Sequence, residues 1–514
     1  MHPRQHAIAG ARVDVAPRDL PPGPAGVRPP AAAGRRDLTT GAIGPTLIAF
    51  ALPTLGSNVL QSLNSSINAI WVGRFLGEGA LAATSNAAII MFLMFGAVFG
   101  FGMAATILVG QAMGRHDVEA ARRAFGSAVA LVVGASAVIG ALGWVFAADI
   151  LRALATPGDA MPLALAYLRV IFLGLPASML LVLLMAAMRG TGDSVTPLWF
   201  MGLSVAIDGG LNPLLIEGIG PFPRMGIAGS ATATLIANHV AAVALLGFMY
   251  LRDMPLRLRG AEWRYLVPER SLTRTIVAKG LPIGAQLLVM STAGLTMMGL
   301  VNRLGVETAA AYGVSQQLWT YIQMPALAIG AGVSAMAAQN IGAGRWDRVD
   351  RITGSGLLLN VGVTGAVVVA ILLFDRPVMT LFLATASPAL GIARHIQLLS
   401  SWNFVLFGMA MVLFSTVRAN GAVLAPLAIL VVAMYPVRLG FALAMRPVLG
   451  PDALWLSFPL GSGASLTMAA LYYRHGGWRR DTMLAAGPGV RHGHEARGHL
   501  PAGEEPAGMI HPTG

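Results

Sequence analysis

Cysteine is absent from this chain of 514 residues, and charged residues make up only 11% of it. Without cysteine the protein has no disulfide framework, no thiolate chemistry and no cysteine-based metal site. The low charge accompanies 55% hydrophobic residues and a mean hydropathy of +0.68, which is far above that of a soluble globular domain. The composition therefore indicates a protein whose main solvent is lipid.

The alternating polar and apolar pattern of barrel strands is also missing. Apolar runs of about 20 residues or more recur instead, each long enough to cross about 30 Å of hydrocarbon as a helix. We predict an all-α integral membrane fold with twelve transmembrane helices, in two six-helix bundles related by an internal repeat. The predicted spans are residues 44–72, 79–111, 121–148, 161–187, 195–216, 226–251, 279–302, 308–341, 353–374, 389–416, 423–445 and 453–472.

The two ends of the chain differ in composition from the spans. Residues 1–42 are rich in Pro, Ala, Gly and Arg and lack a continuous apolar segment, which predicts a disordered cytoplasmic tail rather than a signal peptide. Residues 474–514 predict a second such tail. Between them we expect an N-terminal bundle at 43–251, a cytoplasmic linker at 252–278 and a C-terminal bundle at 279–473.

The net charge of +12 would suggest a nucleic-acid partner in a soluble protein. Here the positive residues fall between the predicted spans, where they set membrane topology instead. Connections on one face hold 15 Lys and Arg, and those on the opposite face hold 7. Because positive loops stay in the cytoplasm, we expect both termini there, in a bacterial inner membrane. We expect a monomer that contacts membrane lipid and binds no nucleic acid.

An internal repeat relates the two halves. Matching residues lie 228 to 230 positions apart: Pro53 and Pro282, Leu76-Gly77 and Leu304-Gly305, Gln111 and Gln339, Gly114 and Gly342, Asp117 and Asp347, Arg189 and Arg418, Gly192 and Gly421, Pro197 and Pro426. One period contains six spans, so both halves enter the membrane from the same side. The two prolines each fall in a first span, where proline tends to bend a helix.

Asp208 is the clearest ionisable residue at membrane depth, where such groups are costly and usually functional. Asn212 lies one turn further on the same helical face. A carboxylate and an amide at this spacing can jointly bind a small cation or hold a protonated acid. A neutral structural acid is the alternative.

Other polar side chains interrupt the apolar spans. Gln61, Asn64 and Asn68 form a stripe down the first span, and Thr234 and Asn238 share a face of the sixth. The second half offers the amides of Gln286, Gln316 and Asn403, but no central acid. Hydrogen bonding between helices explains the stripe equally well. We expect Arg169 and Arg438 to snorkel or to pair internally, and His239 to be a structural hydrogen-bond donor.

Several motifs together identify a family. They are Asn68-Ala-Ile-Trp-Val-Gly73, Gly110-Gln111 with Gly114, Arg189-Gly-Thr-Gly-Asp193 with Pro197, and Asn212-Pro213 followed by Pro221-Phe-Pro223 and Gly226-Ile-Ala-Gly229. In this order, and with the repeat, the chain resembles MATE (multidrug and toxic compound extrusion) transporters over residues 43–473. The resemblance implies a V-shaped pair of six-helix bundles that alternates between inward-open and outward-open states. Cationic or amphipathic organic compounds would leave in exchange for H⁺ or Na⁺.

The resemblance also implies site residues. Asp208, Asn212, Asn68 and Thr234 would form the ion-coupling site, with no cofactor besides the coupling ion. Members of the family usually have the Asn before the Asp in the fifth span, and often an acid where Asn68 stands, so this chain departs from the pattern twice. The substrate cleft would take Gln61, Asn64, Asn238, Gln286, Gln316 and Asn403.

Two other classes compete with this interpretation. A flippase for a lipid-linked or lipid-like cargo shares the general architecture, but should place several cations in the cleft to hold a pyrophosphate. The central charge here is an acid. A membrane enzyme should cluster His, Asp, Glu or Ser at catalytic or metal-binding spacing. The ten histidines are scattered, so we expect neither an enzyme nor a metal site.

Overall fold

The computed structural model describes residues 37–153, 156, 158, 161–380, 382, 387–481 and 483, and within the first helix it leaves out most side chains of residues 78–97. The first half contains α1 (Ile43–Gly114), α2 (Val118–Ala153), α3 (Met161–Gly190), α4 (Val195–Glu217) and α5 (Ile227–Leu251), and η1 (Gly260–Leu266) follows. The second half contains α6 (Arg270–Asn302), α7 (Val306–Gly342), α8 (Trp346–Leu373), α9 (Asp375–Met379), α10 (Pro388–Ser400), α11 (Asn403–Ala419), α12 (Leu424–Val432), η2 (Ala433–Leu439), α13 (Gly440–Ala444), α14 (Arg446–Leu449), α15 (Asp452–His475) and η3 (Gly477–Arg480).

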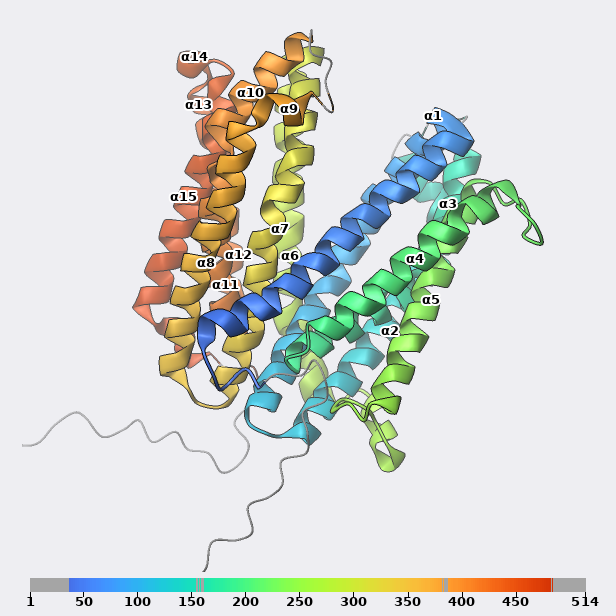
Figure 1. Cartoon of the computed structure of the whole chain (residues 1–514), viewed down its shortest axis with the longest axis vertical. Helices are drawn as coiled ribbons and strands as arrows, with labels where there is room; N and C mark the ends of the chain where they lie inside the picture. The colour runs from blue at the N-terminus through green and yellow to red at the C-terminus, as the bar shows by residue number, and fades with distance from the viewer. Residues whose placement is uncertain are drawn as a thin grey trace, which may run out of the picture.

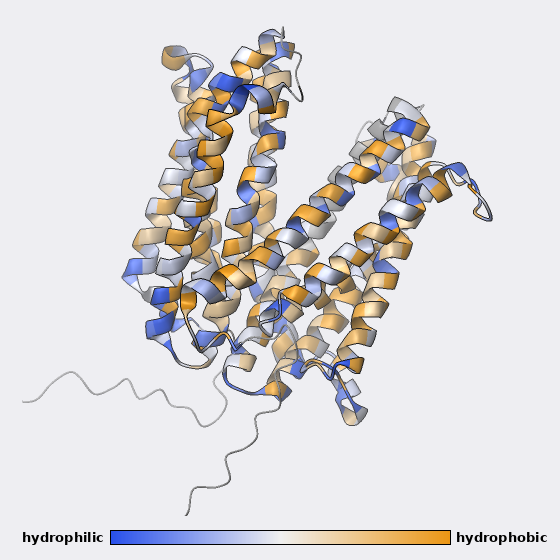
Figure 2. Ribbon diagram, viewed as in Figure 1, coloured by the Kyte–Doolittle hydropathy of each residue, from blue (hydrophilic) through white to orange (hydrophobic). Residues whose placement is uncertain are grey.

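The helices form two arms that meet at one end and diverge at the other (Figure 1). One arm holds α2 to α5 and most of α1, and the other holds the helices of the second half. Hydrophobic residues cover most of the length of both arms, whereas hydrophilic residues gather at the ends of the helices and in the loops (Figure 2). The predicted all-α architecture of two bundles is confirmed.

Glycines separate the first two spans of each half. Gly77 has φ 80° and ψ −173° inside α1, and Gly305 between α6 and α7 has φ 105° and ψ 167°. Residues with a Cβ rarely adopt such positive φ values. A helix therefore breaks at each of these two repeat-related positions.

Within the described residues, ten helices are long and apolar enough to cross a membrane, and α10 with α11 forms an eleventh span that is bent by 41°. The predicted span at 79–111 corresponds to the part of α1 after Gly77. Its described apolar portion is Val98–Gly114. The predicted span at 423–445 is continuous in space, but it contains a π-helical segment, η2, that the hydropathy pattern did not indicate.

The backbone turns after α3 and α11 show the repeat directly. Gly192 has φ 94° and donates its N–H to the carbonyl oxygen of Arg189 at 3.1 Å, while Gly421 has φ 99° and donates to Arg418 at 2.8 Å. Each turn needs a residue without a Cβ. The sequence repeat is thus also a repeat of backbone conformation.

Small residues allow the two halves to touch closely where the arms meet. A Cβ added to Gly114 would overlap the carbonyl oxygen of Gln339, and one added to Gly342 would overlap that of Gln111. Gly100 and Gly280 make a third contact of this kind. The glycines let α1 approach α6 and α7 at backbone distance.

Both predicted tails extend too far into the ordered structure. Leu38 is fully buried and its N–H bonds to Oε1 of Gln339, while Trp478 is fully buried in η3. Each is a single apolar side chain that packs against the helices. The polar composition of the surrounding segment did not indicate this packing. In addition, α6 begins at Arg270, inside the predicted linker 252–278.

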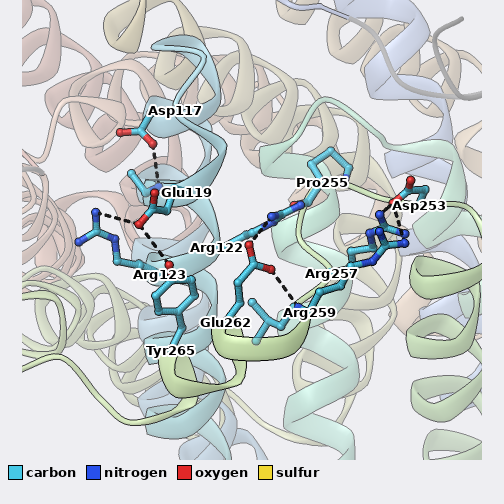
Figure 3. A network of polar contacts seen from close by, with 12 residues as sticks. Asp117, Glu119, Arg122, Arg123, Asp253, Pro255, Arg257, Arg259, Glu262 and Tyr265 are labelled. Carbon is cyan, nitrogen blue, oxygen red and sulfur yellow. Dashed lines mark hydrogen bonds and ion pairs between the residues drawn. The ribbon is translucent and has the colours of Figure 1, made fainter. Parts of the chain in front are cut away.

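One ion pair and two hydrogen bonds hold the linker against α2 (Figure 3). Arg122 on α2 bonds to Glu262 at 2.5 Å and to the carbonyl oxygen of Pro255 at 2.8 Å. Tyr265 donates its hydroxyl to Glu119 at 3.1 Å. The linker is therefore docked on the first half rather than free.

Candidate functional site

The candidate site is centred on the carboxylate of Asp208, in the middle of α4. This helix has 23 residues, and Asp208 and Asn212 lie among its buried positions. Asp208 is 1% exposed and Asn212 is fully buried. Their spacing of one turn puts both side chains on the inner face of the helix, as the sequence predicted.

Two other helices supply hydrogen bonds to this carboxylate. From α1, Asn64 and Asn68 each donate an amide N–H to Oδ2 of Asp208, at 2.8 and 3.0 Å. From α5, the hydroxyl of Thr234 lies 3.1 and 3.2 Å from the two carboxylate oxygens. The four predicted ion-coupling residues are thus in contact, and Asn64, predicted for the substrate cleft, joins them.

Asn212 closes the network around the acid. Its Nδ2 lies 2.6 Å from Oδ1 of Asn68 and 3.2 Å from Oδ1 of Asp208. The Oδ1 atoms of Asn64 and Asn212 are buried and have no hydrogen-bond partner in the part of the chain that the structure describes. Buried acceptors beside a carboxylate would suit a small cation, because such an ion binds several oxygens at once.

The carboxylate of Asp208 has no counter-ion among the described residues. None of the ion pairs in the described part of the chain involves Asp208. The hydrogen-bond partners of its carboxylate are amides and a hydroxyl. Burying an unpaired charge is costly. The shell therefore favours binding of one proton or one monovalent cation. No group of three or more His, Cys, Asp or Glu that could hold a metal occurs among the described residues.

The remaining residues predicted for the cleft do not come together. Asn238 links three helices of the first bundle, accepting from Ser204 and donating to Ser178. Gln286 is buried against Arg418 at 3.1 Å. Gln61 and Gln316 are exposed on separate halves.

Asn403 lines a cavity inside the second bundle, together with Arg438. No sequence pattern indicated that this arginine lines a cavity. Arg169 stacks on Trp144 at 4.9 Å and so pairs internally, as expected. His239 is exposed, and its Nδ1 contacts the carbonyl oxygen of Leu235 in its own helix at 2.8 Å.

Comparison with known proteins agrees with the geometry. The MatE family matches residues 53–214 and again residues 282–443, a displacement of 229 residues at both ends. The chain is 33% identical to the probable multidrug resistance protein YoeA of Bacillus subtilis, over 83% of this chain and 92% of that protein. It is 30% identical to the probable multidrug resistance protein NorM of Deinococcus radiodurans, over 83% and 93%.

Solved structures share the fold. A crystal structure of MATE in complex with MaL6 superposes with a TM-score of 0.79 at 20% identity, covering 85% of this chain and 97% of that one. The two matches to the family model cover more than half of the chain and repeat at the interval found in its own sequence. The chain therefore belongs to the MATE family and is a transporter rather than an enzyme.

Proposed function

We propose that this protein is a secondary-active antiporter that exports cationic or amphipathic organic compounds in exchange for H⁺ or Na⁺. The observation that carries the proposal is the buried carboxylate of Asp208, shared by α1, α4 and α5 and surrounded by neutral donors. A proton or Na⁺ would neutralise this charge. Relatives named as multidrug resistance proteins support a varied organic cargo.

The path of α1 suggests how ion binding would act on the whole molecule. Its first turns pack against the second half, where Leu47 and Phe50 belong to the same buried hydrophobic cluster as Val333 and Met336 of α7. Asn64 and Asn68, further along the same helix, hold Asp208 in the first half. Neutralising Asp208 weakens those two bonds, because a charged acceptor binds N–H groups more strongly than a neutral one. We infer that α1 then shifts between the two halves.

The closed end of the molecule supports an orientation. The linker and both ends of the described chain lie where the arms meet (Figure 1), and the linker alone carries six arginines against three acids. By the positive-inside rule this end faces the cytoplasm. The structure then corresponds to an outward-open state of a monomer in the bacterial inner membrane, with both termini inside and lipid around the arms. Alternating access would then close the outer end and open the cytoplasmic end.

Reconstituted vesicles provide the test. The purified protein is placed in liposomes with a fluorescent organic cation inside, and either a pH gradient or a Na⁺ gradient is imposed. We expect one gradient to accelerate efflux and the other to have little effect, which identifies the coupling ion. An efflux rate that neither gradient changes would rule out antiport.

A further inference from the structure

A cavity of about 120 Å³ lies inside the second bundle, away from Asp208. It is formed by α6, α7, α11, η2 and α15, and its lining residues are Met290, Gln323, Asn403, Phe404, Phe407, Met434, Arg438, Phe458 and Ser462. The lining contains one cation, two amides, a hydroxyl and three phenyl rings, but no carboxylate. Pockets for entire drug-sized molecules usually measure about 300 Å³ or more, so this cavity fits a single head group.

Arg438 is the only charged residue among those that line the cavity. Its guanidinium lies 3.7 Å from the ring centroid of Phe458, and Nη1 is 3.6 Å from the sulfur of Met434. Its Nε is buried without a hydrogen-bond partner. Within the described chain no carboxylate pairs with this side chain, although arginine has five N–H donors and stays charged. Most of its donors therefore remain available.

The amide groups beside Arg438 also have donors to offer. Ser462 donates its hydroxyl to Oδ1 of Asn403, so the Nδ2 group of Asn403 remains as a donor. Gln323, which also carries an amide, lines the same cavity. Together with the guanidinium, these groups present N–H donors around a space that contains no negative charge. An oxyanion is the ligand that such a set of donors recognises.

The internal repeat places Arg438 beside the counterpart of Asp208. Pro197 and Pro426, near the starts of α4 and α12, lie 229 residues apart, so the residue that matches Asp208 by number is Val437. Val437 and Arg438 both lie in η2, a π-helical segment. Arg438 therefore follows by one residue the position that corresponds to Asp208.

We propose that the cavity is a subsite for an anionic group of the cargo, such as a carboxylate, a sulfonate or a phosphate, held by Arg438, Asn403 and Gln323. Phe404, Phe407 and Phe458 would contact the adjoining apolar part. This inference rests on the proposed transport function. It extends the range of cargo from cations to zwitterions, with an acid in the first bundle and a base one residue after the corresponding position in the second.

Two matched dyes test the subsite. Rhodamine B carries a free carboxylate, whereas its ethyl ester has the same ring system without that charge. Binding of each dye to detergent-purified protein is measured by fluorescence polarisation. We expect Arg438→Gln to weaken rhodamine B binding about tenfold or more, as loss of a charge-assisted pair implies, and to change ester binding less than twofold. Arg438→Lys keeps the charge but not the planar fork, so it should retain part of the affinity.

Arg303→Gln is the control, because it removes an exposed arginine from the end of α6 in the same half. Unchanged rhodamine B binding by Arg438→Gln would overturn the proposal. An equal loss of affinity for both dyes in Arg438→Gln and in Arg438→Lys would also overturn it, because such a loss indicates a structural role for Arg438. If Arg438→Gln does not fold, Asn403→Leu takes its place with the same expected discrimination. Gradient-driven efflux of the ester by the wild type reports separately on the transport function.

Discussion

The side-chain amides of Gln111 and Gln339 cross between the two halves of the molecule in opposite directions. Nε2 of Gln111 donates to the carbonyl oxygen of Ala419 at 2.7 Å, and Nε2 of Gln339 donates to that of Gly190 at 2.9 Å. Both glutamines are buried. Gln111 and Gln339 are related by the repeat, and so are Gly190 and Ala419, so one interaction occurs twice and closes the end of the molecule where the arms meet.

Removing these amides should weaken the closed end. Gln111→Leu or Gln339→Leu leaves a buried carbonyl oxygen without its partner, at a cost of about 1–3 kcal/mol each. We expect the population to shift toward the state that is open at this end. Because the chain has no cysteine, spin labels on cysteines introduced at Arg115 and Asp347 can report the distance between the halves.

The double variant should show a longer distance distribution between these labels than the wild type. Gln316→Leu is the control, since it removes an exposed glutamine from α7. An unchanged distribution in the double variant would mean that the two amides do not hold this end closed.

The glycines at the same contact should tolerate even less change. Gly114→Ala brings a Cβ into the backbone carbonyl of Gln339, which has no room to move. We expect Gly114→Ala to prevent closure of this end and to reduce transport severely while the protein still inserts into the membrane. Gly102→Ala is the comparison, because a Cβ there meets nothing within 4 Å. Equal transport by the two variants would contradict the prediction.

Trp478 should contribute strongly to stability, although it follows the last span. It is fully buried, stacks on Tyr473 with ring centroids 5.3 Å apart, and its carbonyl oxygen accepts from Asn420 at 2.8 Å. We expect Trp478→Ala to cost about 3–5 kcal/mol and to lower the melting temperature of the detergent-purified protein. Trp263→Ala, at a residue that is 54% exposed, should have a far smaller effect. Similar melting temperatures for the two variants would argue against the packing role.

The docking of the linker should depend on pH. The backbone N–H of Arg259 has the largest effect and holds the pKa of Glu262 below its usual range. Burial opposes this shift, and the Arg122 guanidinium adds to it. A lowered pKa in the folded state stabilises docking at neutral pH, and the effect is lost as pH falls through that pKa. Hydrogen exchange of residues 253–267, relative to the intrinsic exchange rate at each pH, should therefore accelerate as the pH is lowered into the acid range.

Glu262→Gln should bring the same acceleration at neutral pH, because it cannot carry the charge. Glu307→Gln, at an exposed acid in the first turn of α7, should leave this segment unchanged. Slow exchange of the linker in Glu262→Gln at neutral pH would show that the ion pair does not hold it.

Hydropathy was enough to predict the helices, because each span buries its backbone hydrogen bonds in lipid regardless of its neighbours. The contact of Asp208 with Asn212 followed from helical spacing alone. Asn64 was harder to assign: the stripe of Gln61, Asn64 and Asn68 has one face, but its spacing does not say which residues meet another helix. Gln61 is exposed, while the other two meet Asp208.

The second bundle was predicted least well. The environment of Arg438 depends on η2, and a π-helical turn has no recognisable sequence pattern here. The cavity beside Arg438 is lined by residues from five separate elements. A local sequence pattern cannot predict that these residues lie close together. Trp478 was missed for a similar reason, because a single apolar residue in a polar segment gives no periodic signal.

In the proposed mechanism, Asp208 couples ion entry to export. Asp208→Asn keeps the size of the side chain and most of its hydrogen bonds, but it cannot exchange a proton or balance Na⁺. Adding Asn212→Asp to this variant returns an acid to the same buried network, 3.2 Å from the original carboxylate in the wild type, and should restore export in part.

Gradient-driven dye efflux from liposomes that contain equal amounts of folded wild type and Asp208→Asn tests this claim most directly. We predict that Asp208→Asn abolishes the acceleration of efflux by the coupling-ion gradient, while its melting temperature stays near that of the wild type. Full wild-type efflux by Asp208→Asn would contradict the proposed coupling mechanism.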